Sequence, residues 1–303
     1  MPTASHHKMR RLAVFILAVG AAVGIVLAVA PKRAAAPTGG VPEVAASMFP
    51  VYDIARNVAG DAAEVSLILP PGASPHTYEP TPSDAVKLQR ASVVYAIGHG
   101  IDGWIDVMLA DAKTQKVVVD RGIALRHAPA GSDAAGDDPH YWLAVANAKI
   151  IAKDIADDLS ARFPSRAAAF ASNLAKYDDA LDAADREVRA ILDPVANKRI
   201  VTMHDAWYYF AAAYGISIVG SFEPTAGREP TPQYLVALKE AVEAAKAKTL
   251  YTEPLISTAS IESFIRDEKL KVATLDPIEG ASGVGTGYAE IMVRNARVIR
   301  DNQ

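Results

Sequence analysis

Short apolar runs recur along the chain from Glu43 onward, and stretches with the spacing of amphipathic helices lie between them. The runs show little alternation of polar and apolar residues, which is typical of parallel strands covered on both faces. Eight strands are expected, at Val44–Ala46, Glu64–Leu69, Val93–Ile97, Val117–Val119, Ile200–Met203, Ile216–Gly220, Thr249–Thr252 and Val272–Leu275. Helices are expected between them, for example at Ala85–Arg90, Tyr234–Ala247 and Ser260–Glu268. This alternation predicts an α/β fold with parallel sheets.

One long helical pattern, from Ser165 to Leu192, interrupts the alternation. Its larger apolar positions follow one another in steps of three and four residues, which places them in a narrow stripe on one helix face. They are Phe170, Leu174, Tyr177, Leu181, Ala184, Val188 and Ile191. Ser165 is expected to cap the start of this helix, and Asp193 followed by Pro194 is expected to end it. Since about 28 helical residues extend over about 42 Å, the helix is long enough to cross a molecule with two lobes.

These patterns divide the chain into five parts. Residues 1–36 form an export signal or membrane anchor, and the Pro- and Gly-containing residues 37–42 form a linker. Residues 43–163 are expected to form a first α/β lobe, residues 164–194 the spanning helix and residues 195–303 a second α/β lobe.

The first part has the pattern of a targeting segment. Basic residues up to Arg11 precede 19 apolar or glycine residues, Leu12–Ala30, as in the basic and apolar regions of an export signal. The apolar run is also close to the minimum length of a membrane span. Ala34–Ala36 has the small residues of a cleavage site, but Pro37 follows directly. A cleaved signal and a retained anchor therefore both stay open, and either predicts that the body is exported to the periplasm.

The composition excludes several kinds of site and partner. The chain of 303 residues contains no cysteine, which excludes disulfides, cysteine-ligated zinc, iron–sulfur clusters and a thiol nucleophile. It also excludes the lipid-modified cysteine of a lipoprotein. Residues 1–36 contain five basic and no acidic residues, so the remainder carries 26 basic and 35 acidic residues, a net charge of −9. An acidic body argues against nucleic acid as a partner and mildly favours small cations.

Four polar residues stand where a metal site is expected. His76 lies in a Pro- and Gly-rich loop after a predicted strand, and His140 precedes a predicted helix. His204 and Asp276 directly follow predicted strands. Open parallel sheets bind ligands beyond the carboxyl ends of their strands, and three of these residues occupy such positions.

Three imidazoles and one carboxylate make a four-coordinate site for a divalent first-row metal, and zinc fits it best. Magnesium and calcium prefer oxygen ligands. The competing interpretation is that three unrelated histidines lie at loop ends and that the aspartate caps a helix. Position alone does not decide between the two interpretations.

Five sequence motifs add a family resemblance. They are Phe49-Pro-Val-Tyr-Asp-Ile-Ala-Arg-Asn-Val-Ala-Gly60, Pro71-Gly-Ala-Ser-Pro-His-Thr-Tyr-Glu-Pro80, Asp138-Pro-His-Tyr-Trp-Leu143, His204-Asp-Ala-Trp-Tyr-Tyr-Phe210 and Leu275-Asp-Pro277. In this order they resemble the metal-specific solute-binding proteins of zinc and manganese ABC importers, over about residues 43–300. The second motif, which contains His76, is the most specific of the five.

The resemblance implies metal ligands at His76, His140, His204 and Asp276, in a cleft between two small α/β lobes joined by one long rigid helix. It also implies a monomeric binding protein without enzymatic activity. Such a protein captures zinc or manganese and delivers the ion to an ABC permease in the inner membrane, which works with an ATPase. Because manganese-selective members commonly have Glu at the third ligand position, His204 favours zinc.

The chain departs from the family pattern before the second ligand. Zinc-importing members often carry a long His-rich loop there, whereas His127–Pro139 is short and contains one histidine. The fourth ligand stays open between Asp276, Glu253 and water, and Glu253 is expected rather to hydrogen-bond a ligand. His99 and His127 are not expected to bind the metal.

Two other classes of function compete with a transport protein. A zinc hydrolase keeps an open coordination position for water and needs a general base, but the chain has no His-Glu-x-x-His motif. The other alternative is a surface adhesion or structural protein that binds a metal incidentally.

Overall fold

The computed structural model describes residues 40–110, 112–127, 136–223, 230–280 and 285–303. The predicted signal or anchor at residues 1–36 lies outside the described residues, as do residues 37–39, the first half of the predicted linker. Within the described ranges, no helix combines the length and the apolar character that a membrane span requires.

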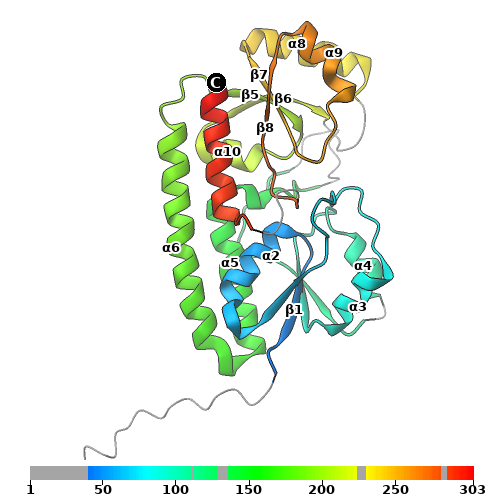
Figure 1. Ribbon diagram of the computed structural model, residues 1–303, viewed down its shortest axis with the longest axis vertical. Coiled ribbons are helices and arrows are strands. Elements are labelled where there is room, and N and C mark those ends of the chain that lie inside the picture. The colour runs from blue at the N-terminus through cyan, green and yellow to red at the C-terminus, as the bar shows by residue number, and fades with distance from the viewer. Residues whose placement is uncertain (1–39, 111, 128–135, 224–229, 281–284) are drawn as a thin grey trace, which may run out of the picture. The chain divides into compact units, whose positions relative to one another are not determined.

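Two four-stranded sheets form the centres of two lobes (Figure 1). In the first lobe the strand order is β2-β1-β3-β4, with β1 at Glu43–Ala46, β2 at Glu64–Leu67, β3 at Val93–Ala96 and β4 at Gln115–Val118. In the second lobe the order is β6-β5-β7-β8, with β5 at Arg199–His204, β6 at Ser217–Glu223, β7 at Thr249–Thr252 and β8 at Lys271–Thr274. All neighbouring strands are parallel, which confirms the predicted α/β class and its eight strands.

Short helices cover the sheets of both lobes. The first lobe contains α2 (Phe49–Ala59), α3 (Pro82–Arg90) and α4 (Trp104–Leu109), and the second contains α7 (Tyr208–Tyr214), α8 (Pro232–Ala245) and α9 (Glu262–Asp267). Side chains cap the starts of two of these helices. Thr81 and Asp84 form a capping box at the start of α3, and Thr231 accepts a hydrogen bond from the backbone of Tyr234 at the start of α8.

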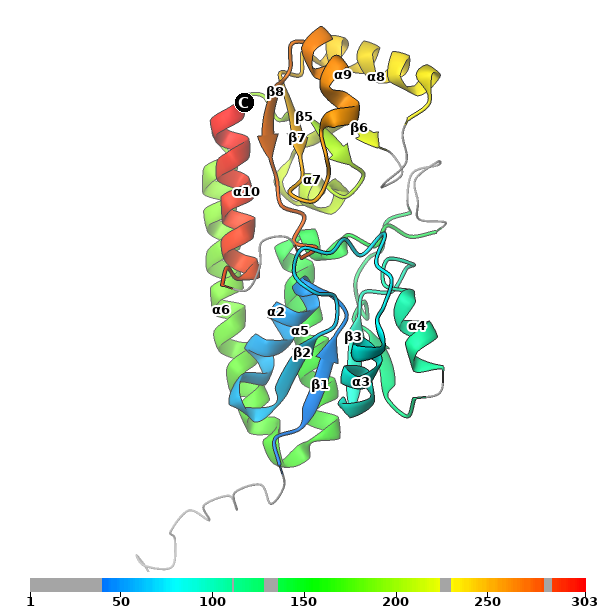
Figure 2. The ribbon, with the colours of Figure 1, turned by 45° about the vertical axis from the view of Figure 1, so that its right-hand side comes forward.

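The long helix α6 spans Ala167–Leu192, 26 residues, and runs beside both lobes (Figures 1 and 2). It packs against α2, α5 (Val145–Arg162) and α10 (Tyr288–Asn302). The predicted apolar stripe is the packed face, and its residues Phe170, Tyr177, Leu181, Ala184 and Val188 are buried. The spanning helix is therefore confirmed.

The predicted cap of this helix is wrong. Ser165 lies within a 3-10 turn, Pro164–Arg166, and α6 begins after that turn. Arg166 stands at the cap position, and no side chain caps the first backbone amides. The tight turn after Pro164 moves the first α-helical residue two positions beyond Ser165, so the serine cannot reach the amides that it was expected to cap.

The largest hydrophobic cluster includes buried residues of both lobes and of α2, α5, α6 and α10. The structure thus joins the lobes by a shared core as well as by the chain. In this arrangement the carboxyl ends of strands in the two sheets point toward the region between the lobes (Figure 2), where loops from both lobes meet.

Candidate metal centre

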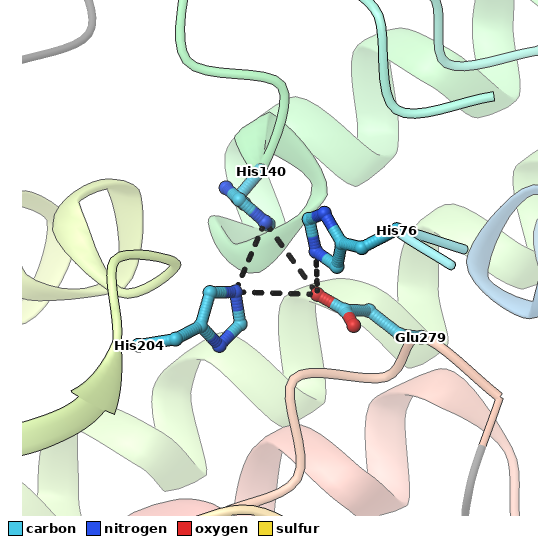
Figure 3. Close-up of side chains that lie close together, drawn as sticks. All are labelled: His76, His140, His204 and Glu279. Atoms are coloured by element: carbon cyan, nitrogen blue, oxygen red, sulfur yellow. Dashed lines mark hydrogen bonds and ion pairs between the residues drawn. The ribbon is translucent and has the colours of Figure 1, made fainter. Parts of the chain in front are cut away.

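Loops at the strand ends bring four side chains together (Figure 3). His76 lies in the loop after β2, and His140 directly precedes a 3-10 turn, Tyr141–Leu143. His204 is the last residue of β5, and Glu279 lies between β8 and α10. One nitrogen or oxygen atom from each side chain lies within 4.8 Å of the corresponding atoms of the other three. Three of the four residues predicted from the sequence are in this cluster.

The distances within the cluster suit a four-coordinate ion. Glu279 Oε1 lies 3.6 Å from Nε2 of His76, 3.5 Å from that of His140 and 3.7 Å from that of His204. The Nε2 atoms of His140 and His204 are 3.4 Å apart. Around a tetrahedral zinc ion with bonds of about 2.0–2.1 Å, neighbouring ligand atoms are about 3.3 Å apart. These four distances are therefore close to the edges of a zinc coordination tetrahedron, and the two remaining distances, from Nε2 of His76 to the other two imidazoles, are at most 4.8 Å.

Burial makes this arrangement of donors informative. His140, His204 and Glu279 are buried, and only His76 is partly exposed. Nε2 of His76 and Oε1 of Glu279 are inaccessible to solvent and have no hydrogen-bond partner among the described residues. Because an unpartnered buried polar atom is costly, convergent lone pairs of this kind fit a cation held between them.

Two carboxylates outside the cluster orient two of its imidazoles. Nδ1 of His140 lies 2.9 Å from Oδ1 of Asp138, and Nδ1 of His204 lies 2.7 Å from both carboxylate oxygens of Glu253. A carboxylate at Nδ1 holds the proton there and leaves the lone pair on Nε2, the nitrogen that faces the cluster. Glu253 thus contacts a cluster histidine and lies outside the cluster itself.

The charges within the site shift its proton affinities. Burial lowers the pKa of His140, but hydrogen bonds and charges from Asp138 and Glu279 outweigh it and raise that pKa to about 10. At His204, burial likewise lowers the pKa, but the carboxylates of Glu253 and Glu279 outweigh this effect, so the pKa is also raised. Burial disfavours the charged form of Glu279, yet the imidazoles around it hold its pKa well below the usual range. The Glu279 carboxylate is therefore ionised and can bind a cation, whereas protons compete with the cation for the imidazoles of His140 and His204.

Asp276, predicted as the fourth ligand, is not in the cluster. Its carboxylate accepts hydrogen bonds from the backbone N–H of Ile278 at 2.8 Å and from Nη2 of Arg294 at 3.0 Å. The backbone turns sharply at Ile278, where φ is +64°, and Glu279 reaches the imidazoles instead. Sequence reasoning missed Glu279, and the only signal for it was a second carboxylate three residues after the strand-end aspartate.

A cavity of about 300 Å³ adjoins the cluster. Its lining includes six ionisable side chains, His76, His204, Glu223, Glu253, Asp276 and Glu279. The rest of the lining comes from Ser74 and Thr77 in the first lobe and from Pro277 and residues within 254–260 in the second. An acidic cavity beside a set of imidazoles favours a cation over an anion.

Two further histidines lie outside the cluster. Nε2 of His99 is 2.9 Å from Oδ2 of Asp120. His127 is largely exposed, and its Nδ1 lies 3.3 Å from Oδ1 of Asp137. Neither residue belongs to a group of three or more potential metal ligands in the described part of the chain.

The comparisons with known families and with known sequences agree with each other. The family model described as zinc-uptake complex component A, periplasmic, matches residues 44–302. The manganese ABC transporter substrate-binding lipoprotein PsaA of Streptococcus mitis is 29% identical, over 93% of this chain and 94% of that protein. The zinc-binding lipoprotein AdcA of Streptococcus pneumoniae (serotype 4) is also 29% identical, over 85% of this chain but only 55% of AdcA.

Solved structures agree with the sequence comparison. The solute-binding protein FpvC of Pseudomonas aeruginosa in complex with Mn²⁺ superposes with a TM-score of 0.79 at 25% identity. The match covers 87% of this chain and 98% of FpvC. The two-lobed arrangement is thus shared almost throughout the described residues.

Proposed function

The chain belongs to the family of zinc-uptake complex component A, and we propose that it is the extracytoplasmic metal-binding component of an ABC importer. It captures one divalent ion and delivers it to a permease in the inner membrane that works with an ATPase. The single observation that carries this proposal is the convergence of three imidazoles and one carboxylate on a buried point between the lobes. The family match supports the transport role.

We propose His76, His140, His204 and Glu279 as the metal ligands. The distances between their donor atoms and the burial of those atoms support this set. Asp276, the carboxylate first expected from the sequence, is assigned no direct bond to the metal, because both its oxygens are engaged with other partners. Glu253 and Asp138 act by orienting His204 and His140.

Zinc is the proposed cargo. Three imidazoles with one carboxylate suit zinc in tetrahedral geometry, whereas manganese prefers more oxygen ligands. Manganese is the alternative cargo, because PsaA is named a manganese transporter protein and FpvC was solved with Mn²⁺. The four protein ligands also occupy all four positions of a tetrahedral ion, whereas a hydrolytic zinc site keeps one position for water, which supports a binding protein without enzymatic activity.

We also propose that the protein is periplasmic and monomeric. The basic residues followed by the apolar run Leu12–Ala30 support export. PsaA and AdcA are both named lipoproteins, whereas this chain contains no cysteine that could carry a lipid. We therefore infer that residues 1–36 act as a cleaved signal or as a membrane anchor.

Metal loading tests the proposal directly. Residues 37–303 are purified, stripped of metal, loaded with zinc and examined by native mass spectrometry. We expect one zinc ion per chain and tighter binding of zinc than of manganese in competition. A variant with His140→Ala and His204→Ala is the control and should carry no zinc. Failure of the unmodified protein to retain zinc contradicts the proposal.

A further inference from the structure

The backbone of Ile278 adopts a conformation that is unfavourable for its side chain. Its φ is +64°, in the left-handed region that few residues other than glycine occupy and that is an outlier for a β-branched residue. The side chain is only 1% exposed and belongs to the largest hydrophobic cluster. Strain of this kind persists only where the surroundings enforce it, and it is concentrated at functional sites.

Hydrogen bonds to one buried side chain fix the start of this turn. Asn295 of α10, which is 1% exposed, accepts from the backbone N–H of Asp276 at 2.9 Å and donates to the Asp276 carbonyl at 2.7 Å. The Asp276 carboxylate in turn accepts from the N–H of Ile278 at 2.8 Å. Asp276 therefore connects α10 to the strained residue.

The rest of the turn is bonded to the segments that carry two other ligands. Nε1 of Trp142, two residues after His140, donates to the carbonyl of Pro277 at 2.8 Å. The N–H of Gly72, in the loop that carries His76, donates to the carbonyl of Gly280 at 3.1 Å. Residues 276–280, here called the Glu279 turn, thus bridge the second lobe and the ligand-bearing segments of the first.

We propose that the Glu279 turn is a strained positioning device that holds Glu279 at the metal and accelerates release of the ion when it relaxes. This inference rests on the proposed function and deepens it. Ile278 and Asp276 are its positioning residues. While the turn is closed, the backbone of Ile278 bears the cost of the left-handed conformation. When the turn opens, Ile278 regains ordinary φ values and Glu279 withdraws, so the strain favours dissociation of the ion.

A protein that delivers an ion to a permease must also release that ion. Three imidazoles and a carboxylate around zinc make a tight site, and a tight site releases its ion slowly unless something opposes the closed state. Strain stored in a ligand-bearing turn that is hydrogen-bonded to both lobes opposes closure without removing a ligand. Zinc holds the Glu279 turn closed only through its higher affinity for the closed state than for the open state. Because strain raises the free energy of the closed state, it lowers zinc affinity and raises the dissociation rate together.

Two substitutions separate backbone strain from side-chain packing. Ile278→Gly and Ile278→Ala both remove the buried isoleucine side chain, but only alanine retains a Cβ that disfavours the left-handed region. Zinc dissociation is measured by stopped flow with excess chelator. We expect dissociation from Ile278→Gly to be slower than from Ile278→Ala by about three- to tenfold, after allowing for the extra chain freedom that glycine loses on closure.

Lys246 supplies a matched control. It has a φ of +52° at the end of α8 in the second lobe and is not in the ligand cluster. Lys246→Gly should be more thermally stable than Lys246→Ala, with no difference in zinc dissociation. Equal dissociation rates for the two Ile278 variants would overturn the inference and leave the proposed function intact. Absence of zinc binding by the unmodified protein would instead defeat the proposed function.

Hydrogen exchange in the unmodified protein tests the inference even if the Ile278 variants do not fold. The N–H of Ile278, which donates to Asp276, should exchange at least about tenfold more slowly in the zinc-loaded protein than in the metal-free protein, because zinc holds the turn closed. The N–H of Lys246, which donates to carbonyls of α8, should show no such change. Equal protection of Ile278 in both states would overturn the inference.

Discussion

Both carboxylate oxygens of Glu253 lie 2.7 Å from Nδ1 of His204. The two residues emerge side by side because β5, which ends at His204, pairs directly with β7, which Glu253 follows. Nε1 of Trp207 donates to Glu253 at 3.2 Å and fixes the carboxylate in turn. Register between two neighbouring strands thus sets the tautomer and the ring direction of one proposed ligand.

Loss of this carboxylate should weaken metal binding although Glu253 does not touch the metal. We expect Glu253→Gln to lower zinc affinity by about 10- to 100-fold, because the amide no longer provides the negative charge that makes the imidazole a stronger donor. Chelator competition measures the change. Asp120→Asn, which alters the partner of His99 outside the cluster, is the control. An equal loss in both variants would contradict the assignment of Glu253.

The fourth ligand can be identified by comparing two carboxylates three residues apart. Glu279→Ala should lower zinc affinity by orders of magnitude, as should alanine at any of the three cluster histidines. Asp276→Asn should lower it by less than about tenfold, because an amide oxygen can still accept from the N–H of Ile278 while the ligand set stays complete. Calorimetry on zinc-free protein measures both. If Asp276→Asn proves as damaging as His140→Ala, then Asp276 is a ligand after all.

The fold could be predicted largely because its signals are local and periodic. Buried parallel strands form continuous apolar runs, and most of the eight were visible as such. The stripe on α6 repeats at the helical spacing over most of its length. The start of α6 could not be placed, because whether Ser165 caps a helix or sits in a 3-10 turn depends on how the chain leaves α5.

The candidate site could be predicted only in part from the sequence. His76, His140 and His204 could be proposed from their positions beyond strands and before a helix. The carboxylate of the cluster could not, because isoleucine gives no sequence signal for the left-handed turn at position 278 that directs Glu279 inward. That turn is held by Asn295 and Trp142, and their proximity to it is a product of the tertiary fold.

Zinc should change the arrangement of the lobes only slightly. Besides α6, direct bonds hold the start of α10 to the first lobe, where Asp53 accepts from the N–H of Tyr288 at 2.9 Å and the Tyr288 hydroxyl donates to the Trp142 carbonyl at 2.6 Å. We therefore expect the radius of gyration in solution scattering to change by less than about 1 Å on adding zinc. Asp53→Ala removes one of these bonds and should show a larger change. A large compaction of the unmodified protein would contradict this prediction.

Zinc affinity should continue to rise with pH well above the range in which a free imidazole loses its proton. Zinc requires the neutral form of each imidazole, so bound protons compete with it. A free histidine titrates near 6.5, but the pKa of His140 is raised to about 10 and that of His204 is also raised.

At pH 7 the metal-free site therefore holds a proton on His140 that zinc must displace, and the raised pKa of His204 adds to this competition. The sign follows directly: affinity falls as pH falls, and it levels off only above the raised pKa values. Around pH 7 we expect a slope of at least about one log unit of affinity per pH unit, and calorimetry in buffers of different ionisation enthalpy should show at least about one proton released per zinc ion.

Asp138→Asn provides the matched variant, because the Asp138 carboxylate raises the pKa of His140 through its hydrogen bond and its charge. Its slope between pH 7 and 8 should be smaller by about one log unit per pH unit than that of the unmodified protein. A slope well below one in the unmodified protein, with the protonation of the chelator corrected, would mean that His140 does not give up a proton to the metal. The ligand set proposed for this chain would then be incorrect.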